Sequence, residues 1–145
     1  MRLVIQRVSA AQVSVAHRVI AAIERGLCVF LGVGILDDQS NADRLAGKLL
    51  RLRIFDDEQG KMNRSVVESD AAILVVSQFT LYGDLRKGNR PSFTDAAPPE
   101  QAQKLYKYFV ERLRASQMTV ATGQFQARME VALKNDGPVT FILEA

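Results

Sequence analysis

Alternation of apolar and polar residues marks the first part of the chain as β-structure. Arg2–Val8 alternates in this way, and Gln12–Val15 and Val19–Ile23 continue it as a meander with His17-Arg18 at a turn. Leu27–Leu31 is an unbroken apolar run, which is typical of a central strand buried on both faces. The chain is therefore expected to begin with a sheet.

Two later segments follow the helical period instead. Ser40 is placed to cap the first helix, whose stripe-forming positions are expected to be Ala42, Leu45, Ala46, Leu49 and Leu52 or Arg53. The second helix is expected to begin near Glu100 and to bury one face: Ala102, Leu105, Tyr106, Phe109, Val110 and Leu113. Both stripes are predicted to pack against the core.

The remaining strands complete a fold class. Ala72–Val76 reads as a second buried strand, and shorter strands are expected around Met118–Val120, Gln126–Leu133 and Val139–Leu143. This order of elements predicts an α+β fold: a strongly twisted, mostly antiparallel β-sheet with two main flanking helices. A length of 145 residues predicts one domain, residues 1–145.

The amino-acid composition indicates the class of protein and the cellular compartment. Apolar residues make up 48% of the chain and charged residues 24%, as in an ordinary soluble protein, and no apolar run is long enough for a membrane span. The single cysteine, Cys28, excludes an internal disulfide and fits the reducing cytoplasm. A net charge of +3 permits contact with nucleic acid without requiring it.

The sequence lacks the residue patterns of several common catalytic and ligand-binding sites. The only histidine, His17, falls at a predicted turn, and Cys28 lies within an apolar strand, so no activated serine or cysteine is expected. The acids Asp56-Asp57-Glu58 lack EF-hand spacing, and Gly32-Val33-Gly34 lacks the third glycine of a dinucleotide loop. We expect neither a metal nor a cofactor, so an enzyme of this sequence must use main-chain donors, hydroxyls and groups of its substrate.

Ser77-Gln78-Phe79-Thr80 fits such chemistry. These residues follow a buried strand, so hydroxyls, an amide and freed backbone N–H groups gather at one rim. Preorganised donors of this kind stabilise a developing oxyanion by about 3 kcal/mol each. The alternative is a strand end whose polar side chains satisfy the local backbone.

Two further segments have both a structural and a functional interpretation. Gly137-Pro138 lies between extended segments and either forms an ordinary Asn-Asp-Gly-Pro turn or presents main-chain carbonyls in an unusual orientation. The polar loop Gly83–Pro99 carries the cations of Arg86–Arg90, which either contact phosphate or face solvent.

Together, Ser77–Tyr82 and Asn135–Thr140 resemble the paired signatures of the D-aminoacyl-tRNA deacylases, and the likeness extends over nearly the whole chain. This resemblance implies a homodimer with a barrel-like β fold. It also implies hydrolysis of the ester that joins a D-amino acid, or glycine, to the terminal adenosine at the acceptor end of tRNA. Such a reaction is a proofreading step in translation.

The resemblance also implies roles for individual residues. Gly137 and Pro138, joined by a cis bond, would enter the partner's pocket and exclude L-amino acids by occupying the space of their side chains. Arg7 would hold this dipeptide through its carbonyls. Ser77, Gln78, Phe79 and Thr80 would orient the ester, while Phe125 and Met129 would line the pocket for the adenosine.

The residues allow alternatives for both the mechanism and the class of protein. Thr80 as a covalent nucleophile lacks an evident base, so we favour substrate-assisted hydrolysis in which the adenosine 2′-hydroxyl positions water. The alternative classes are a non-enzymatic RNA-binding module that uses Arg86–Arg90 and a general esterase. The first lacks an RNA-binding signature and has only 7% aromatic residues, and the second lacks a catalytic triad.

Overall fold

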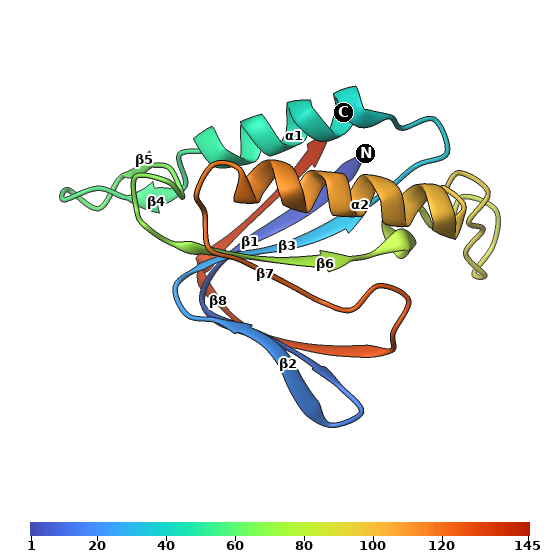
Figure 1. Ribbon diagram of the computed structural model, residues 1–145, viewed down its shortest axis with the longest axis horizontal. Coiled ribbons are helices and arrows are strands. Elements are labelled where there is room, and N and C mark those ends of the chain that lie inside the picture. Colours follow the sequence, from blue (N-terminus) through green and yellow to red (C-terminus); the bar gives the residue numbers. More distant parts are fainter.

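The sheet is organised around one long strand. The computed structural model describes residues 1–145. Strand β1 (Arg2–Val15) pairs along one whole side with β8 (Met129–Glu144), and on its other side with β3 (Gly26–Gly32) and then β2 (Arg18–Ile23), all antiparallel. The segments Arg2–Val8 and Gln12–Val15, which the sequence suggested as separate strands, therefore form one continuous strand, β1 (Figure 1).

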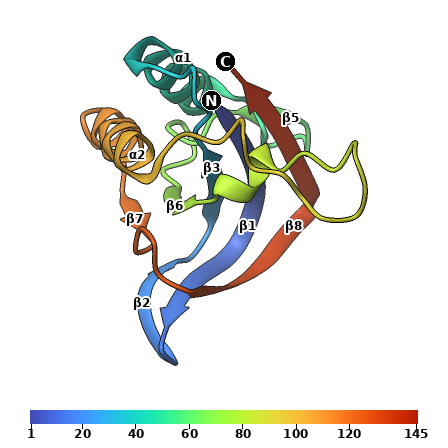
Figure 2. The same ribbon diagram turned by 90° about the vertical axis from the view of Figure 1, so that its right-hand side faces the viewer.

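The sheet continues beyond β3 with parallel strands. β6 (Ala72–Ser77) pairs in parallel with β3, and β7 (Val120–Thr122) pairs in parallel with β6. Each connection crosses over through a helix, first α1 (Gln39–Arg51) and then α2 (Pro99–Arg114), as parallel pairing requires. β2 packs against β6 and β7, which curls the sheet into a nearly closed barrel with both helices on one side (Figure 2).

Three short elements complete the chain: β4 (Phe55–Asp56), β5 (Met62–Arg64) and the 3₁₀ helix η1 (Phe79–Tyr82). The α+β class, the two flanking helices and the barrel-like sheet are confirmed, and the sheet is mixed because of its two parallel pairs. Neither helix combines the length and the apolar character needed to cross a bilayer.

Helix α1 begins two residues earlier than the sequence predicts. Asp38, not Ser40, is the N-cap: its carboxylate accepts hydrogen bonds from the backbone N–H groups of Ser40 and Asn41. The Asn41 side chain accepts one in return from the Asp38 N–H, which completes a capping box. Four residues of the predicted stripe are buried, namely Ala42, Leu45, Ala46 and Leu49, but α1 ends at Arg51, before the last predicted position at Leu52 or Arg53.

Apolar side chains pack on both faces of β3, as predicted for this strand. Leu27, Val29 and Leu31 face the helices, while Cys28 lies in the smaller cluster inside the barrel with Leu74. Burial raises the pKa of the Cys28 thiol to about 12, so the group stays neutral and acts as a core side chain.

Close approach of β3 to β6 leads to a first prediction. A Cβ added at Gly26 would lie 2.0 Å from the Ala72 carbonyl oxygen. We expect Gly26→Ala to lower the free energy of unfolding by about 2–3 kcal/mol, and the Tm by roughly 6–10 °C. Thermal unfolding followed by circular dichroism measures this change.

A second glycine provides the matched control. Gly47 lies inside α1, where an added Cβ would meet only the end of the Arg51 side chain, at 3.4 Å. We expect Gly47→Ala to stabilise the protein by about 0.5–1 kcal/mol because alanine favours helix. Equal effects of the two substitutions would show that the contact between β3 and β6 is not the cause.

Candidate active site at the ends of two parallel strands

A cavity of about 650 Å³ lies where β3 and β6 end. Leu31 and Val33 form one wall, and α2 contributes Pro99 and Ala102 at its N-terminus. The remainder comes from the end of β6 and the residues after it, the segments around Phe93 and Phe125, and the start of β8. Twelve of its sixteen lining residues are hydrophobic, so the cavity suits a largely apolar group. Crevices at the carboxyl ends of parallel strands are common ligand sites.

The polar rim of this cavity is the stretch that the sequence singled out. Ser77 ends β6, and the Gln78 N–H extends the ladder by donating to the Leu31 carbonyl at 2.8 Å. Helix η1 begins at Phe79, and the first N–H groups of a helix have no acceptor within it. The backbone N–H groups of Phe79 and Thr80 therefore have no acceptor within η1.

Thr80 has a different position from its neighbours. Ser77, Gln78 and Phe79 line the cavity, whereas Thr80 is exposed and does not. Its hydroxyl accepts a hydrogen bond from the Gln78 side-chain amide, a group that cannot accept a proton as a general base. The structure thus places no base on the Thr80 hydroxyl.

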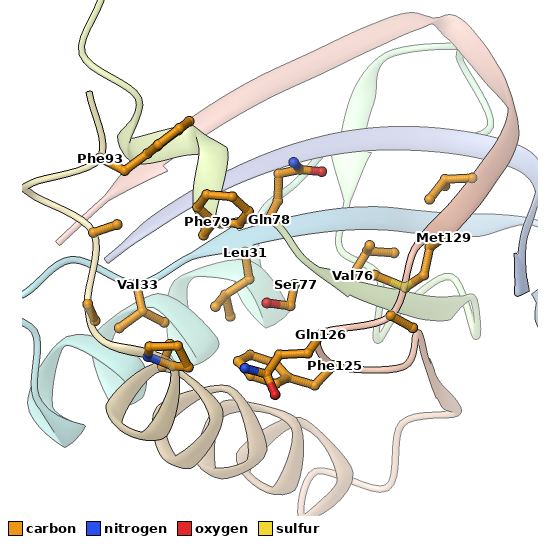
Figure 3. Close-up of a pocket in the computed structure, with 16 residues that line it drawn as sticks. Leu31, Val33, Val76, Ser77, Gln78, Phe79, Phe93, Phe125, Gln126 and Met129 are labelled. Carbon is orange, nitrogen blue, oxygen red and sulfur yellow. The ribbon is translucent and has the colours of Figure 1, made fainter. Parts of the chain in front are cut away.

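Phe125 and Met129 lie across the cavity from this rim. Figure 3 shows Ser77 and Phe125 in the middle, Met129 toward one end, and Phe79 and Phe93 toward the other. Phe125 packs on Tyr106 of α2, with ring centroids 6.0 Å apart. A single chain therefore brings Phe125 and Met129 to the same cavity as the polar rim.

Sequence reasoning missed one wall of the cavity. Phe93, Ala96 and Ala97 line it, and the Phe93 ring packs against the Phe79 ring at a centroid distance of 5.0 Å. They lie in a loop interpreted only for its cations, and no periodic pattern distinguishes them. The apolar residues at the end of this polar loop were the only available signal.

The Gly137-Pro138 dipeptide lies elsewhere in the same chain. β8 does not turn there: Gln6 pairs with Thr140 and Val8 with Asn135, so the residues between them bulge out opposite Arg7. The bond between Gly137 and Pro138 is cis, and both residues are exposed. The turn interpretation is therefore wrong, because the strand resumes on the same partner. Neither residue lines the cavity of this chain.

Arg7 anchors this bulge from beneath. Only 6% of Arg7 is exposed, and its guanidinium donates to the Ile54 carbonyl at 2.8 Å and pairs with Asp56 Oδ1 at 3.1 Å. It also reaches Asp136, at 3.1 Å to Oδ2 and 3.4 Å to the backbone oxygen. Arg7 thus binds the residue before the dipeptide rather than the carbonyls of Gly137 and Pro138.

Asn135 closes the base of the bulge. Its side-chain amide donates to the carbonyl of Arg7 at 2.9 Å and to that of Val139 at 3.0 Å. These bonds tie both strands together at the point where their ladder is interrupted. The exposed dipeptide is therefore carried on a well-anchored base.

The cations of the loop after η1 differ in their surroundings. Arg86 forms a two-pronged pair with Asp84, at 2.9 and 2.8 Å, which lowers the pKa of that carboxyl to about 2. Lys87 and Arg90 are exposed and make no ion pair. Two of the three cations noted in the sequence therefore remain available to a polyanion.

Fold and cavity together define an α+β ligand-binding domain whose rim donors are largely main-chain groups. Comparison with known proteins gives the family. Residues 4–144 match the model of the D-Tyr-tRNA(Tyr) deacylase family, and the chain belongs to this family of hydrolases.

Two relatives match this chain over its full length. The chain is 59% identical over 145 residues to a D-aminoacyl-tRNA deacylase of Koribacter versatilis (strain Ellin345), covering 100% of this chain and 97% of the relative. It is 56% identical to a protein of the same name from Symbiobacterium thermophilum (strain DSM 24528 / JCM 14929 / IAM 14863 / T), covering 100% and 96% of the two chains.

Solved structures agree on the fold. The c-Myc DNA Unwinding Element Binding Protein superposes with a TM-score of 0.95 at 44% identity, over 100% of this chain and 99% of that one. A probable eukaryotic D-amino acid tRNA deacylase superposes with a TM-score of 0.85 at 19% identity, over 99% and 98% of the two chains, and shows the same fold.

Proposed function

We propose that residues 1–145 act as one cytoplasmic D-aminoacyl-tRNA deacylase domain. The reaction is hydrolysis of the ester that joins a D-amino acid, or glycine, to the terminal adenosine of tRNA. One observation carries this proposal: the cavity joins the donor rim of Ser77–Phe79 to Phe125 and Met129, in a chain 59% identical to a D-aminoacyl-tRNA deacylase.

The rim supports the chemistry through its main-chain donors. The N–H groups of Phe79 and Thr80 stabilise the oxyanion that forms when water attacks the ester carbonyl. The Ser77 hydroxyl and the Gln78 amide orient the ester. The bond between the carbonyl carbon and the adenosine oxygen then breaks, which leaves a free amino acid and a free tRNA 3′ end.

In this scheme the group that orients the attacking water comes from the substrate, and the proton that the water loses passes to the departing adenosine oxygen. The hydrogen bond received by the Thr80 hydroxyl comes from an amide, and His17 belongs to the turn between β1 and β2. The vicinal 2′-hydroxyl of the adenosine is fixed close to the ester and is able to orient the attacking water. We therefore assign the positioning of that water to the RNA.

Selection against L-amino acids is assigned to the Gly137-Pro138 bulge of a partner protomer. In its own protomer the dipeptide is exposed and outside the cavity. β8 pairs only with β1, and its free edge exposes 38% of Phe141 and 63% of Ile142. A free edge with apolar side chains favours association with a second copy, which would bring the dipeptide to the partner's cavity.

A deacylation assay tests this function. Purified protein is expected to release the amino acid from D-Tyr-tRNA and Gly-tRNA and to leave L-Tyr-tRNA charged. Sedimentation velocity is expected to give the mass of a dimer. Binding of tRNA without release of D-tyrosine would instead support a non-enzymatic RNA-binding module.

Thr80 provides a separate prediction. Thr80→Ala removes the hydroxyl but keeps the N–H group, so we expect kcat on D-Tyr-tRNA to fall by no more than about tenfold. Rapid-quench kinetics combined with mass spectrometry of the protein measures the rate and any covalent product. Complete loss of turnover, together with an acyl-enzyme in the unsubstituted protein, would contradict the substrate-assisted mechanism.

A further inference from the structure

A second hollow adjoins the candidate active site. It has a volume of about 330 Å³ and lies between α2 and the segment Thr122–Phe125. Phe125 lines both hollows and is the residue at which they meet. We call this hollow the second pocket; nothing in the proposed hydrolysis uses it.

The second pocket has the opposite chemical character to the cavity. Only three of its ten lining residues are hydrophobic, so it suits a polar ligand. The side-chain amides of Gln103 and Gln124 line it and offer both donors and acceptors. One face of α2 supplies Gln103, Lys107 and Arg114, at the spacing that brings helical side chains together.

Charge in the second pocket favours an anion. Lys107 and Arg114 line it with one carboxylate, that of Glu111, and none of the three takes part in an ion pair. Arg114 donates only to the Val120 carbonyl, at 3.3 Å, which leaves donors of its guanidinium for a ligand.

The wall shared by the two hollows is firmly held. Tyr106 lines the second pocket, packs on Phe125 and donates its hydroxyl to the Val75 carbonyl at 2.9 Å. Burial raises the pKa of Tyr106 to about 12, so the hydroxyl stays protonated and keeps this bond. The ring of Phe125 is thereby fixed between the two hollows.

We propose that the second pocket binds the nucleotide that precedes the terminal adenosine of tRNA. This inference depends on the proposed function, which places the adenosine beside Phe125 and Met129. The strand leaving that adenosine passes Phe125 and enters the second pocket. Lys107 and Arg114 bind the connecting phosphodiester, and Gln103 and Gln124 meet the base edge.

Two minimal substrates isolate this one nucleotide. D-tyrosyl-adenosine carries no phosphodiester, whereas D-tyrosyl-cytidylyl-adenosine adds one cytidine and one phosphate on the 5′ side. We expect KM to be lower for the dinucleotide by about tenfold, as for a hydrogen bond to a charged group. Its apparent affinity should fall with salt with a log–log slope of about −0.7, the value for one phosphate on a single strand.

Two double variants test which pair of cations binds the phosphodiester of the dinucleotide. In Lys107→Gln/Arg114→Gln, KM for the dinucleotide should rise to the value for D-tyrosyl-adenosine, and the salt dependence should disappear. Lys87→Gln/Arg90→Gln removes the same charge from the exposed loop after η1 and should keep the dinucleotide advantage. Circular dichroism checks that both variants are folded.

The outcomes separate this inference from the proposed function. A wild-type protein that hydrolyses neither substrate would overturn the function itself. Hydrolysis of both with equal KM, or a dinucleotide advantage that survives loss of Lys107 and Arg114, would overturn the second-pocket proposal alone. Loss of the advantage in the Lys87 and Arg90 variant instead would move the phosphate to the loop.

Discussion

Replacing Phe79 with proline should lower kcat on D-Tyr-tRNA by about 10²–10³-fold relative to Phe79→Ala. Both substitutions remove the ring, but only proline removes the backbone N–H that we assign to the oxyanion. Phe79 is the first residue of η1, a position at which proline fits. Gln78 before it has φ −142° and ψ 80°, outside the helical region that a following proline disfavours. Single-turnover rates of the two variants measure the difference.

The comparison of the two variants separates catalysis from packing. Loss of the contact between the Phe79 and Phe93 rings is common to both, and so cancels in the ratio of their rates. Equal values of kcat for Phe79→Pro and Phe79→Ala, with similar Tm, would show that the Phe79 N–H does not contact the reacting ester.

Arg7→Met should make the enzyme accept L-Tyr-tRNA, with the ratio of D to L rates falling by on the order of tenfold or more. Arg7 is the buried anchor of the bulge, so its loss frees the Gly137-Pro138 dipeptide to move away from the L side chain. We expect a loss of about 1–3 kcal/mol in unfolding free energy. Asp56 and Asp136 are half exposed, so water compensates their charges and the loss stays in this range.

Two further variants test whether the loss of selectivity in Arg7→Met comes from its contact with the bulge. Asp136→Asn removes the ion pair with Arg7 but keeps the Asp136 carbonyl, so an intermediate loss of selectivity is expected. Arg53→Met removes an arginine that donates to the Asn63 carbonyl at 2.6 Å, outside the bulge, and should leave the D to L ratio unchanged. Selectivity that is unaltered in Arg7→Met would contradict the assignment of the bulge as the filter.

Local periodicity predicted most elements but not their partners. The buried strands at Leu27–Leu31 and Ala72–Val76 and the stripe of α1 follow from patterns within each segment. Pairing of β3 with β6 and of β6 with β7 is a long-range property. The order strand–helix–strand did contain the signal for parallel pairing, because such a crossover joins parallel strands.

The β8 segment shows why a turn motif can mislead. Asn-Asp-Gly-Pro is typical of a turn, and the sequence gives no sign of what lies opposite. In the fold, Asn135 and Arg7 bind the base of the bulge, and the strand resumes its pairing with β1. Contacts with β1, far away in the sequence, decide the outcome here.

The candidate site was predictable in part for similar reasons. Ser77, Gln78 and Phe79 reach the cavity because they follow a buried strand directly. Thr80 comes after the strand has changed to η1, and its side chain faces outward. Phe93 and Ala97 belong to an irregular loop, and only the folded chain brings them over the cavity.

Because β8 pairs with β1 on both sides of the bulge, the inserted residues lie between two fixed points of the sheet. Val8 pairs with Asn135 and Gln6 with Thr140, so one pair of the ladder lies on each side of the insert. Loops of altered length or composition could be exchanged between these fixed points without shifting the rest of the strand. Libraries built at this single position would test whether the bulge decides which misacylated tRNAs the protein edits.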